Sequence, residues 1–224
     1  MFSFLSYLPK LLQGLLITLE LTFASLIFGG LLALCLVALR SLRIGVLSAL
    51  VISFSAFMRG TPLLAQLFLI YYGSAQLQPW LKEMGLWFAF SNPIVCAIFA
   101  FSLNTAAYQA EIFRGAINSI PRGQIEAARA MAMPKLLILW RIIVPLGGRQ
   151  ALRPYSNEVI LMLKGSAVAS VVAVYDMLGS ARAIFASTYD YSVYVVVGVC
   201  YVLAVEGFRR LLKLIERKVF YQGA

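Results

Sequence analysis

Three long runs of this chain contain no Asp, Glu, Lys or Arg, and they restrict what it can fold into. The runs cover residues 21–39, 60–81 and 84–110. Each approaches or exceeds the ~20 apolar residues that a helix needs to cross a ~30 Å hydrocarbon core. Two weaker stretches, 159–175 and 191–205, contain at most one charge. Only 12% of all residues are charged, compared with roughly 25% in soluble proteins, so the sequence predicts an all-α, polytopic membrane protein.

The apolar stretches predict five transmembrane helices within a single domain, residues 1–224. The helices are expected at about residues 11–39, 50–72, 94–113, 155–175 and 191–212, and the longest loop at 114–154. Pro62 lies inside the second helix and is expected to kink it. The apolar stretch after Lys10 is too long for the core of a cleaved signal peptide, so we expect the first helix to be retained.

The chain contains 19 Lys and Arg residues against 9 Asp and Glu, and their distribution predicts an orientation. Basic residues gather in the segments after the first, third and fifth spans, whereas only Lys10, Lys82 and Arg182 lie in the alternate segments. Because Lys and Arg mark cytoplasmic loops, the N-terminus is expected outside and the C-terminus inside. The excess charge is thereby explained by topology, and we expect no nucleic-acid partner.

The residues that most enzymes and metal sites use are missing from the sequence. There is no histidine, which removes the commonest metal ligand and the commonest general base. The three cysteines, Cys35, Cys96 and Cys200, lie in three different apolar segments, so neither a disulfide nor a metal site is predicted. We therefore expect no catalytic residue and no metal, and a protein that is not an enzyme.

One short segment is unusually polar and rich in alanine for so apolar a chain: GQIEAARAMAMPKLLILWRIIVP, residues 123–145. Pro121 suits the first turn of a helix and Pro134 cannot continue it, so about three helical turns lie between them. Alanine side chains are small enough for another protein to approach the backbone closely. Glu126 and Arg129, at i and i+3, can pair with each other or with a partner. Two interpretations stay open here: an amphipathic helix on the membrane surface, or a docking helix.

The order of residues in this segment resembles the EAA loop of bacterial ABC importer permeases. The sequence Glu-Ala-Ala at 126–128, three residues, Ala132, nine residues and Ile-Ile-Val-Pro at 142–145 matches the spacing of the family pattern. Ala132 stands where the family usually has Gly, and Val144 where it usually has Leu. Three further segments, 59–73, 103–128 and 155–164, resemble the polar amino acid branch (histidine, arginine, glutamine and opine type), particularly the M-type subunits of arginine uptake systems.

This resemblance implies a type I ABC importer permease fold in the bacterial inner membrane, with a cytoplasmic coupling helix at about residues 121–133. It also implies partners: membrane lipid, a second permease (a Q-type subunit in a heterodimer, with a homodimer left open), a dimer of cytosolic ATP-binding subunits and a periplasmic amino acid-binding protein. No cofactor is expected in this chain, since the ATPase subunits bind the ATP. The implied ATPase-coupling residues are Gly123, Glu126, Ala127, Ala128, Arg129 and Ala132.

The implied cargo is a polar or basic amino acid, with arginine first and histidine, lysine, ornithine or an opine after it. Asn104, Tyr108 and Glu111 are spaced by four and three residues, so they share one helical face. Polar groups inside spans are functional candidates, and a carboxylate such as Glu111 suits a guanidinium or ammonium group. Alternatively, Glu111 pairs with Arg114 or Arg59 and only braces helices.

Arg59, an ionisable group inside a span, is a functional candidate for the same reason as Glu111, and Thr61 and Ser166 are weaker candidates for the substrate pathway. For Thr61 and Ser166 the alternative is hydrogen bonding between helices. Glu158 is expected near the start of the fourth span, where a favourable interaction with the helix dipole explains it. A stand-alone channel or secondary carrier of small solutes remains the alternative function for the whole chain.

Overall fold

The computed structural model describes residues 3–42 and 44–221, and the side chains of residues 7–42 and 44–219. Every regular element in this part of the chain is helical. The α-helices are α1 (Ser3–Ser41), α2 (Gly45–Gly60), α3 (Leu63–Gln76), α4 (Gln78–Glu83), α5 (Trp87–Phe90), α6 (Pro93–Asn118), α7 (Arg122–Ala130), α8 (Lys135–Ile138), α9 (Val144–Gly165), α10 (Met177–Thr188) and α11 (Ser192–Tyr221). A π-helical segment, η1 (Leu139–Ile143), precedes α9, and a 3₁₀ segment, η2 (Ser166–Val172), follows it.

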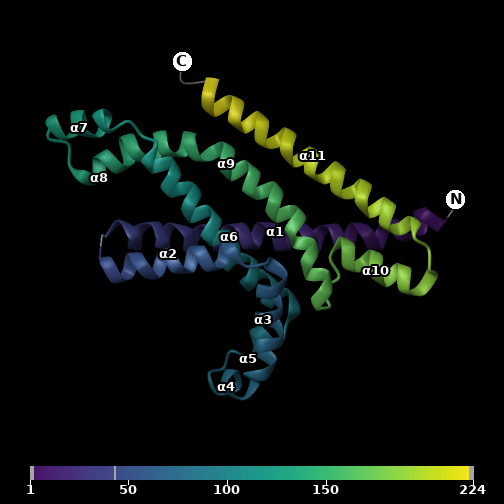
Figure 1. The fold of residues 1–224 in the computed structure, drawn as a ribbon. Coiled ribbons are helices and arrows are strands. Elements are labelled where there is room, and N and C mark those ends of the chain that lie inside the picture. Colours follow the sequence, from purple (N-terminus) through teal and green to yellow (C-terminus); the bar gives the residue numbers. More distant parts are fainter. Residues whose placement is uncertain (1–2, 43, 222–224) are drawn as a thin grey trace.

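Helices α1 and α6 form the central contact of the fold, where they cross (Figure 1). Small residues permit this contact, since a Cβ atom added at Gly29 would meet Thr105 Cγ2 at 2.4 Å and the Ser102 carbonyl oxygen at 3.0 Å. The main apolar cluster surrounds the crossing and includes Leu21 of α1 and Phe101 of α6, both fully buried. Close backbone approach through small residues is typical of helices that associate in membranes.

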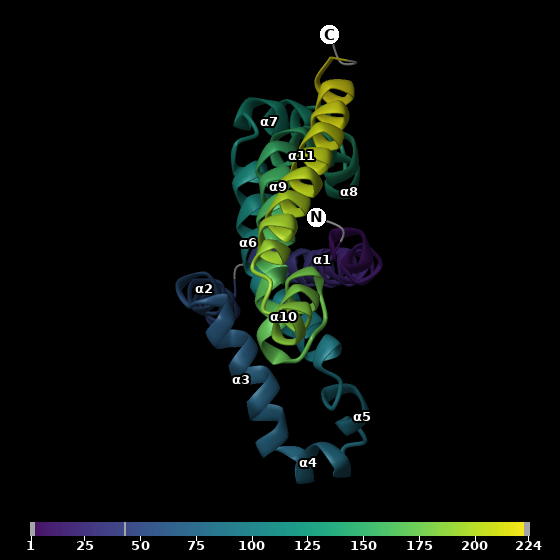
Figure 2. The same ribbon diagram turned by 90° about the vertical axis from the view of Figure 1, so that its right-hand side faces the viewer.

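The predicted second span, residues 50–72, is divided into two helices. α2 and α3 meet at 104° where Thr61 and Pro62 adopt extended backbone conformations. Pro62 has no N–H to donate, and its ring disfavours helical geometry at Thr61, so the expected kink becomes a break. Beyond the break, α3 leads to the short helices α4 and α5, which lie at the opposite end of the molecule from α7 (Figure 2).

The region predicted as a long loop, 114–154, is mostly helical. α6 continues to Asn118, and α9 starts at Val144 and runs through Pro154. The predicted fourth span, 155–175, is therefore the second half of α9 followed by η2, and α10 continues it after a bend of 43°. Ala173, with φ of 59°, lies in the turn that separates η2 from α10.

Two helical segments in the described part are long and apolar enough to cross a membrane: Tyr7–Ser41 of α1 and Pro93–Asn118, which is α6. Two bent pairs could each form one further span: α2 with α3, and the segment Lys135–Val172 with α10. Counting both pairs raises the number of spans to as many as four. The predicted count of five is thus not confirmed. The predicted fifth span, 191–212, corresponds to the N-terminal two thirds of α11, which packs with α10 and the start of α1 around Met177.

Candidate functional site

A network of side-chain amides surrounds the break between α2 and α3. Gln66 Nε2 donates hydrogen bonds to the Met58 carbonyl oxygen at 2.8 Å and to Thr61 Oγ1 at 2.7 Å. Asn104 Nδ2 of α6 donates to the same Met58 oxygen and to Gln66 Oε1, both at 3.0 Å. The end of a helix leaves backbone carbonyls without helical partners, and these amides satisfy one of them. Interrupted helices of this kind often form the substrate sites of transporters.

Next to this network, α2, α6 and α9 line an open cavity of about 450 Å³. Arg59, Tyr108 and Glu111 line it, together with Gln150 and Pro154 of α9. The Tyr108 hydroxyl lies 3.5 Å from the Arg59 carbonyl oxygen, at the long limit for a hydrogen bond. Three of the predicted pathway residues therefore share one cavity, and Thr61 and Asn104 belong to the neighbouring network.

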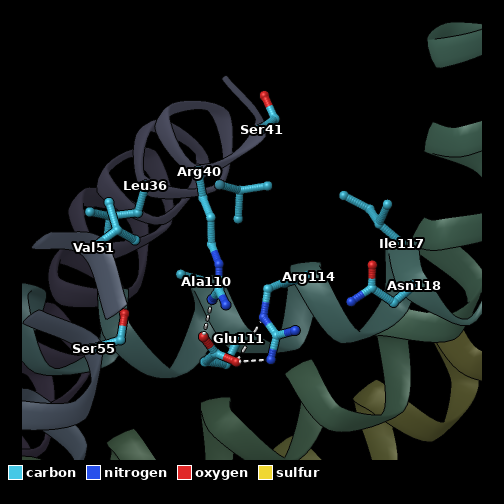
Figure 3. A pocket seen from close by; sticks show the side chains of 11 residues that line it. Leu36, Arg40, Ser41, Val51, Ser55, Ala110, Glu111, Arg114, Ile117 and Asn118 are labelled. Atoms are coloured by element: carbon cyan, nitrogen blue, oxygen red, sulfur yellow. Dashed lines mark hydrogen bonds and ion pairs between the residues drawn. The ribbon is translucent and has the colours of Figure 1, made fainter. Parts of the chain in front are cut away.

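Glu111 is held by two arginines from different parts of the chain (Figure 3). Arg40 Nη1, near the end of α1, lies 3.0 Å from Glu111 Oε1, and Arg114 Nε lies 2.9 Å from Oε2. One predicted partner, Arg114, is thus present. The other, Arg59, makes no ion pair with Glu111 in the part of the chain that the structure describes. With both oxygens engaged, Glu111 connects α1 to α6.

Glu158 lies deep inside the protein, 6% exposed, in the second half of α9. The prediction that it lies at a helix N-terminus is wrong, because α9 begins at Val144. Its Oε1 accepts a hydrogen bond of 2.7 Å from the Thr105 hydroxyl, and Thr105 Oγ1 accepts one of 3.1 Å from Gln109 Nε2. Glu158 makes no ion pair with any described residue. The sequence named Glu158 but did not predict its burial, because that burial depends on how α6 packs against α9.

Ser166 lies apart from the cavity and the amide network. It is fully buried at the start of η2, and its hydroxyl donates to the Leu163 carbonyl oxygen at 2.8 Å. Of the candidate pathway residues, it is the one that the structure does not bring together with the others. Its hydrogen bond stays within its own helix, whereas the sequence offered a bond between helices as the alternative.

The predicted coupling residues lie on and beside α7, at one end of the molecule (Figure 1). Glu126, Ala127 and Arg129 are exposed, and a Cβ atom added at Gly123 would meet nothing within 4 Å. Ala128 is fully buried, so its methyl group packs inside this chain. Of the two alternatives, a pair between Glu126 and Arg129 is absent from the described residues, and both side chains border a hollow of about 800 Å³.

Ala132 ends the turn that follows α7, and it has a positive φ of 55°. The Ala132 N–H donates to the Arg129 carbonyl oxygen at 2.9 Å, and the Met133 N–H donates to the Ala128 carbonyl oxygen at 3.1 Å. These two bonds form a Schellman motif, whose left-handed position is usually glycine. The backbone thus gives a physical reason for the glycine that the family pattern has at this place.

Comparison with known proteins gives a family for this arrangement. The binding-protein-dependent transport system inner membrane component family matches residues 25–221. The chain belongs to this family. It is therefore an inner membrane component of a transport system and not an enzyme, as the sequence predicted.

Individual relatives match over nearly the whole chain. The nopaline transport system permease protein NocM of Agrobacterium fabrum is 43% identical over 93% of this chain and 87% of that protein. The arginine ABC transporter permease protein ArtM of Escherichia coli is 39% identical over 95% of each chain. A crystal structure of an amino acid ABC transporter with histidines has 33% identity and a TM-score of 0.85, over 96% of this chain and 97% of that one.

Proposed function

We propose that this chain is the permease subunit of an ATP-driven, binding-protein-dependent amino acid importer, with arginine as the first candidate substrate. The observation that carries this proposal is the match, over almost the full length, to an arginine permease and a nopaline permease. The similarity to a solved amino acid ABC transporter supports the same class of cargo. Histidine, lysine, ornithine and opines follow arginine as candidates.

In the proposed mechanism, α7 docks in a cleft of the cytosolic ATPase. Its exposed face carries Glu126 with no partner among the described residues, so the carboxylate is available to a basic group of the ATPase. The end of α6 leads into α7, and α8 leads from it towards α9. A displacement of α7 on ATP binding would therefore reach α6 and α9, two of the three helices that line the cavity at Arg59 and Tyr108.

The proposed substrate pathway passes the break between α2 and α3. Asn104 and Thr61 supply fixed hydrogen-bonding groups there, and Tyr108 and Arg59 line the adjacent cavity. We assign Glu111 to the wall of this path, because Arg40 and Arg114 engage its carboxylate. Ser166 is assigned a structural role, because its hydroxyl donates to the Leu163 carbonyl oxygen at the end of α9.

The proposed orientation has the N-terminus in the periplasm and the C-terminus in the cytoplasm. Two segments with many basic residues, α7 to α8 and the C-terminal part of α11, lie at the same end of the molecule, and α4, with Lys82, lies at the other (Figures 1 and 2). A second permease, an ATPase dimer and a periplasmic binding protein complete the proposed importer. No cofactor is assigned to this chain.

Reconstitution of the importer tests the proposed function. The chain, its companion permease, the ATPase and the binding protein would be placed in proteoliposomes, and uptake of labelled arginine measured against histidine, lysine, ornithine and nopaline. We expect uptake that requires both ATP and the ATPase subunits. Uptake by the permease without the ATPase would contradict the proposal and favour a stand-alone channel or carrier.

A further inference from the structure

Glu111 also borders a second cavity, of about 330 Å³, between the end of α1, α2 and the end of α6. Its apolar lining includes Leu36 and Val37 of α1 together with Val51 of α2. Its polar lining includes Arg40 and Arg114 (Figure 3). The cavity thus combines a charged group with an apolar wall, near the point where α1 leaves its apolar run.

The charges in this cavity do not balance. Two guanidinium groups, of Arg40 and Arg114, face the single carboxylate of Glu111, which leaves one positive charge in excess. Each guanidinium has five N–H donors. One nitrogen of Arg40 and two of Arg114 are used by Glu111, and the other donors have no partner among the described residues. The arginines are therefore fixed in place and still able to bind an anion.

A buried hydroxyl gives a second, independent sign of a ligand. Ser55 of α2 lines the same cavity and is 2% exposed, and its Oγ has no hydrogen-bond partner in the described part of the chain. An unpaired buried polar group costs free energy. A polar ligand would satisfy such a group.

We infer that this cavity binds the phosphodiester headgroup of an anionic phospholipid. Guanidinium groups match phosphate oxygens in charge and geometry, and basic pockets between membrane helices on the cytoplasmic side suit lipid headgroups. The acyl chains would lie on the apolar faces of α1 and α2 outside the cavity. Leu34, Val46 and Leu50 are 57%, 72% and 62% exposed on these helices. A free phosphate ion shares the chemistry of the headgroup, but it has no acyl chains to cover the apolar faces of α1 and α2.

Native mass spectrometry of the complete importer tests this inference. The complex would be released from nanodiscs of phosphatidylglycerol mixed with phosphatidylcholine, and the lipid that stays bound identified. We expect phosphatidylglycerol to be retained, and Arg40→Gln to weaken its binding at least about tenfold, as expected when a charge-assisted hydrogen bond is lost. Arg40→Lys keeps the positive charge but loses the planar guanidinium group. Its lipid retention should therefore lie between that of the wild type and that of Arg40→Gln.

Arg210→Gln is the matched control, since it removes the same charge from an exposed arginine of α11 that pairs with Glu206. It should leave lipid retention unchanged. A second arm adds inorganic phosphate alone: if phosphate competes with the lipid through Arg40, the shared phosphate chemistry is supported. Equal retention of both lipids, or equal retention by the wild type and Arg40→Gln, would overturn the inference. The result does not depend on transport, so it stands apart from the proposed function.

Discussion

The crossing of α1 and α6 and the helix α7 are both built from small residues, but the residues serve opposite purposes. At the crossing, Gly29 is in such close contact with Thr105 that there is no room for a methyl group. At α7, Gly123 faces open space, and Ala127 is exposed. Small residues in the first region let two helices of this chain approach each other. In the second they leave a surface that another protein can approach.

This difference links the crossing of α1 and α6 to folding of the chain, and the exposed face of α7 to the proposed coupling with the ATPase. A change at the crossing has to disturb this chain's own packing, because interiors packed at high density tolerate little added volume. A change on the exposed face of α7 leaves that packing intact, because Glu126 has no partner among the described residues. The two regions should therefore respond differently to mutation: one in the stability of the complex, the other in transport.

Reversal of the charge on α7 should have the largest effect. We expect Glu126→Lys to lower ATP-driven uptake at least about tenfold, because the proposed charge-assisted contact with the ATPase would be replaced by a repulsive one. The melting temperature of the isolated permease should stay within about 1 °C of the wild type, since an exposed helix position costs little. Uptake in proteoliposomes and thermal unfolding measure the two quantities.

Glu83→Lys supplies the control for this reversal. Glu83 is exposed in α4, at the opposite end of the molecule (Figure 2). The same charge reversal there should leave the coupling between ATP hydrolysis and uptake unchanged. Full uptake by Glu126→Lys would remove the assigned role of α7, and a large loss of its thermal stability would show that Glu126 supports the fold.

A methyl group at the crossing should have the next largest effect, on stability. We expect Gly29→Ala to destabilise the complex by about 1–3 kcal/mol, since its Cβ would lie 2.4 Å from Thr105 Cγ2 and Thr105 is held by Glu158. Gly198→Ala in α11 is the control, as nothing lies within 4 Å of its added Cβ. That substitution should be neutral or stabilise slightly, because alanine is a better helix former than glycine. Equal melting temperatures for the two variants would contradict the close contact.

The sequence predicts features that depend on neighbouring residues. A long apolar stretch, in which Glu20 is the one charged residue, is enough to place a helix at 11–39, inside α1, and two prolines bracket the segment that contains α7. Residues spaced by helical periodicity, such as Tyr108 and Glu111, reach the same cavity because a regular helix carries them. Such features follow from chain geometry over one to a few turns.

Other features depend on contacts between distant segments, and the sequence does not predict them. Arg40 pairs with Glu111 across 71 positions, and Thr105 bonds Glu158 across 53. Pro62 signals a kink, but the 104° angle depends on amides from α3 and α6 that satisfy the broken end of α2. The predicted loop ends at residue 154, yet α9 passes through Pro154.

The smallest predicted effect lies at the end of α7, and it tests whether this helix is stabilised by its own chain before any partner binds. Ala132 has a positive φ, which costs an L-residue roughly 1 kcal/mol and glycine almost nothing. Ala132→Gly should therefore strengthen the Schellman turn. The Met133 amide, which donates to the Ala128 carbonyl oxygen, should exchange about fivefold more slowly with deuterium.

Ala130→Gly makes the same chemical change two residues earlier, inside the last turn of α7. There φ is helical, so glycine should cost about 1 kcal/mol and speed up the exchange of the same amide. If one Ala-to-Gly substitution slows the exchange of the Met133 amide and the other speeds it up, backbone geometry, and not side-chain size, sets the stability of this turn. Equal signs would mean that Ala132 is not left-handed in solution. In that case backbone geometry would not explain the family's glycine. The explanation would have to be that a small residue lets the ATPase approach α7 closely.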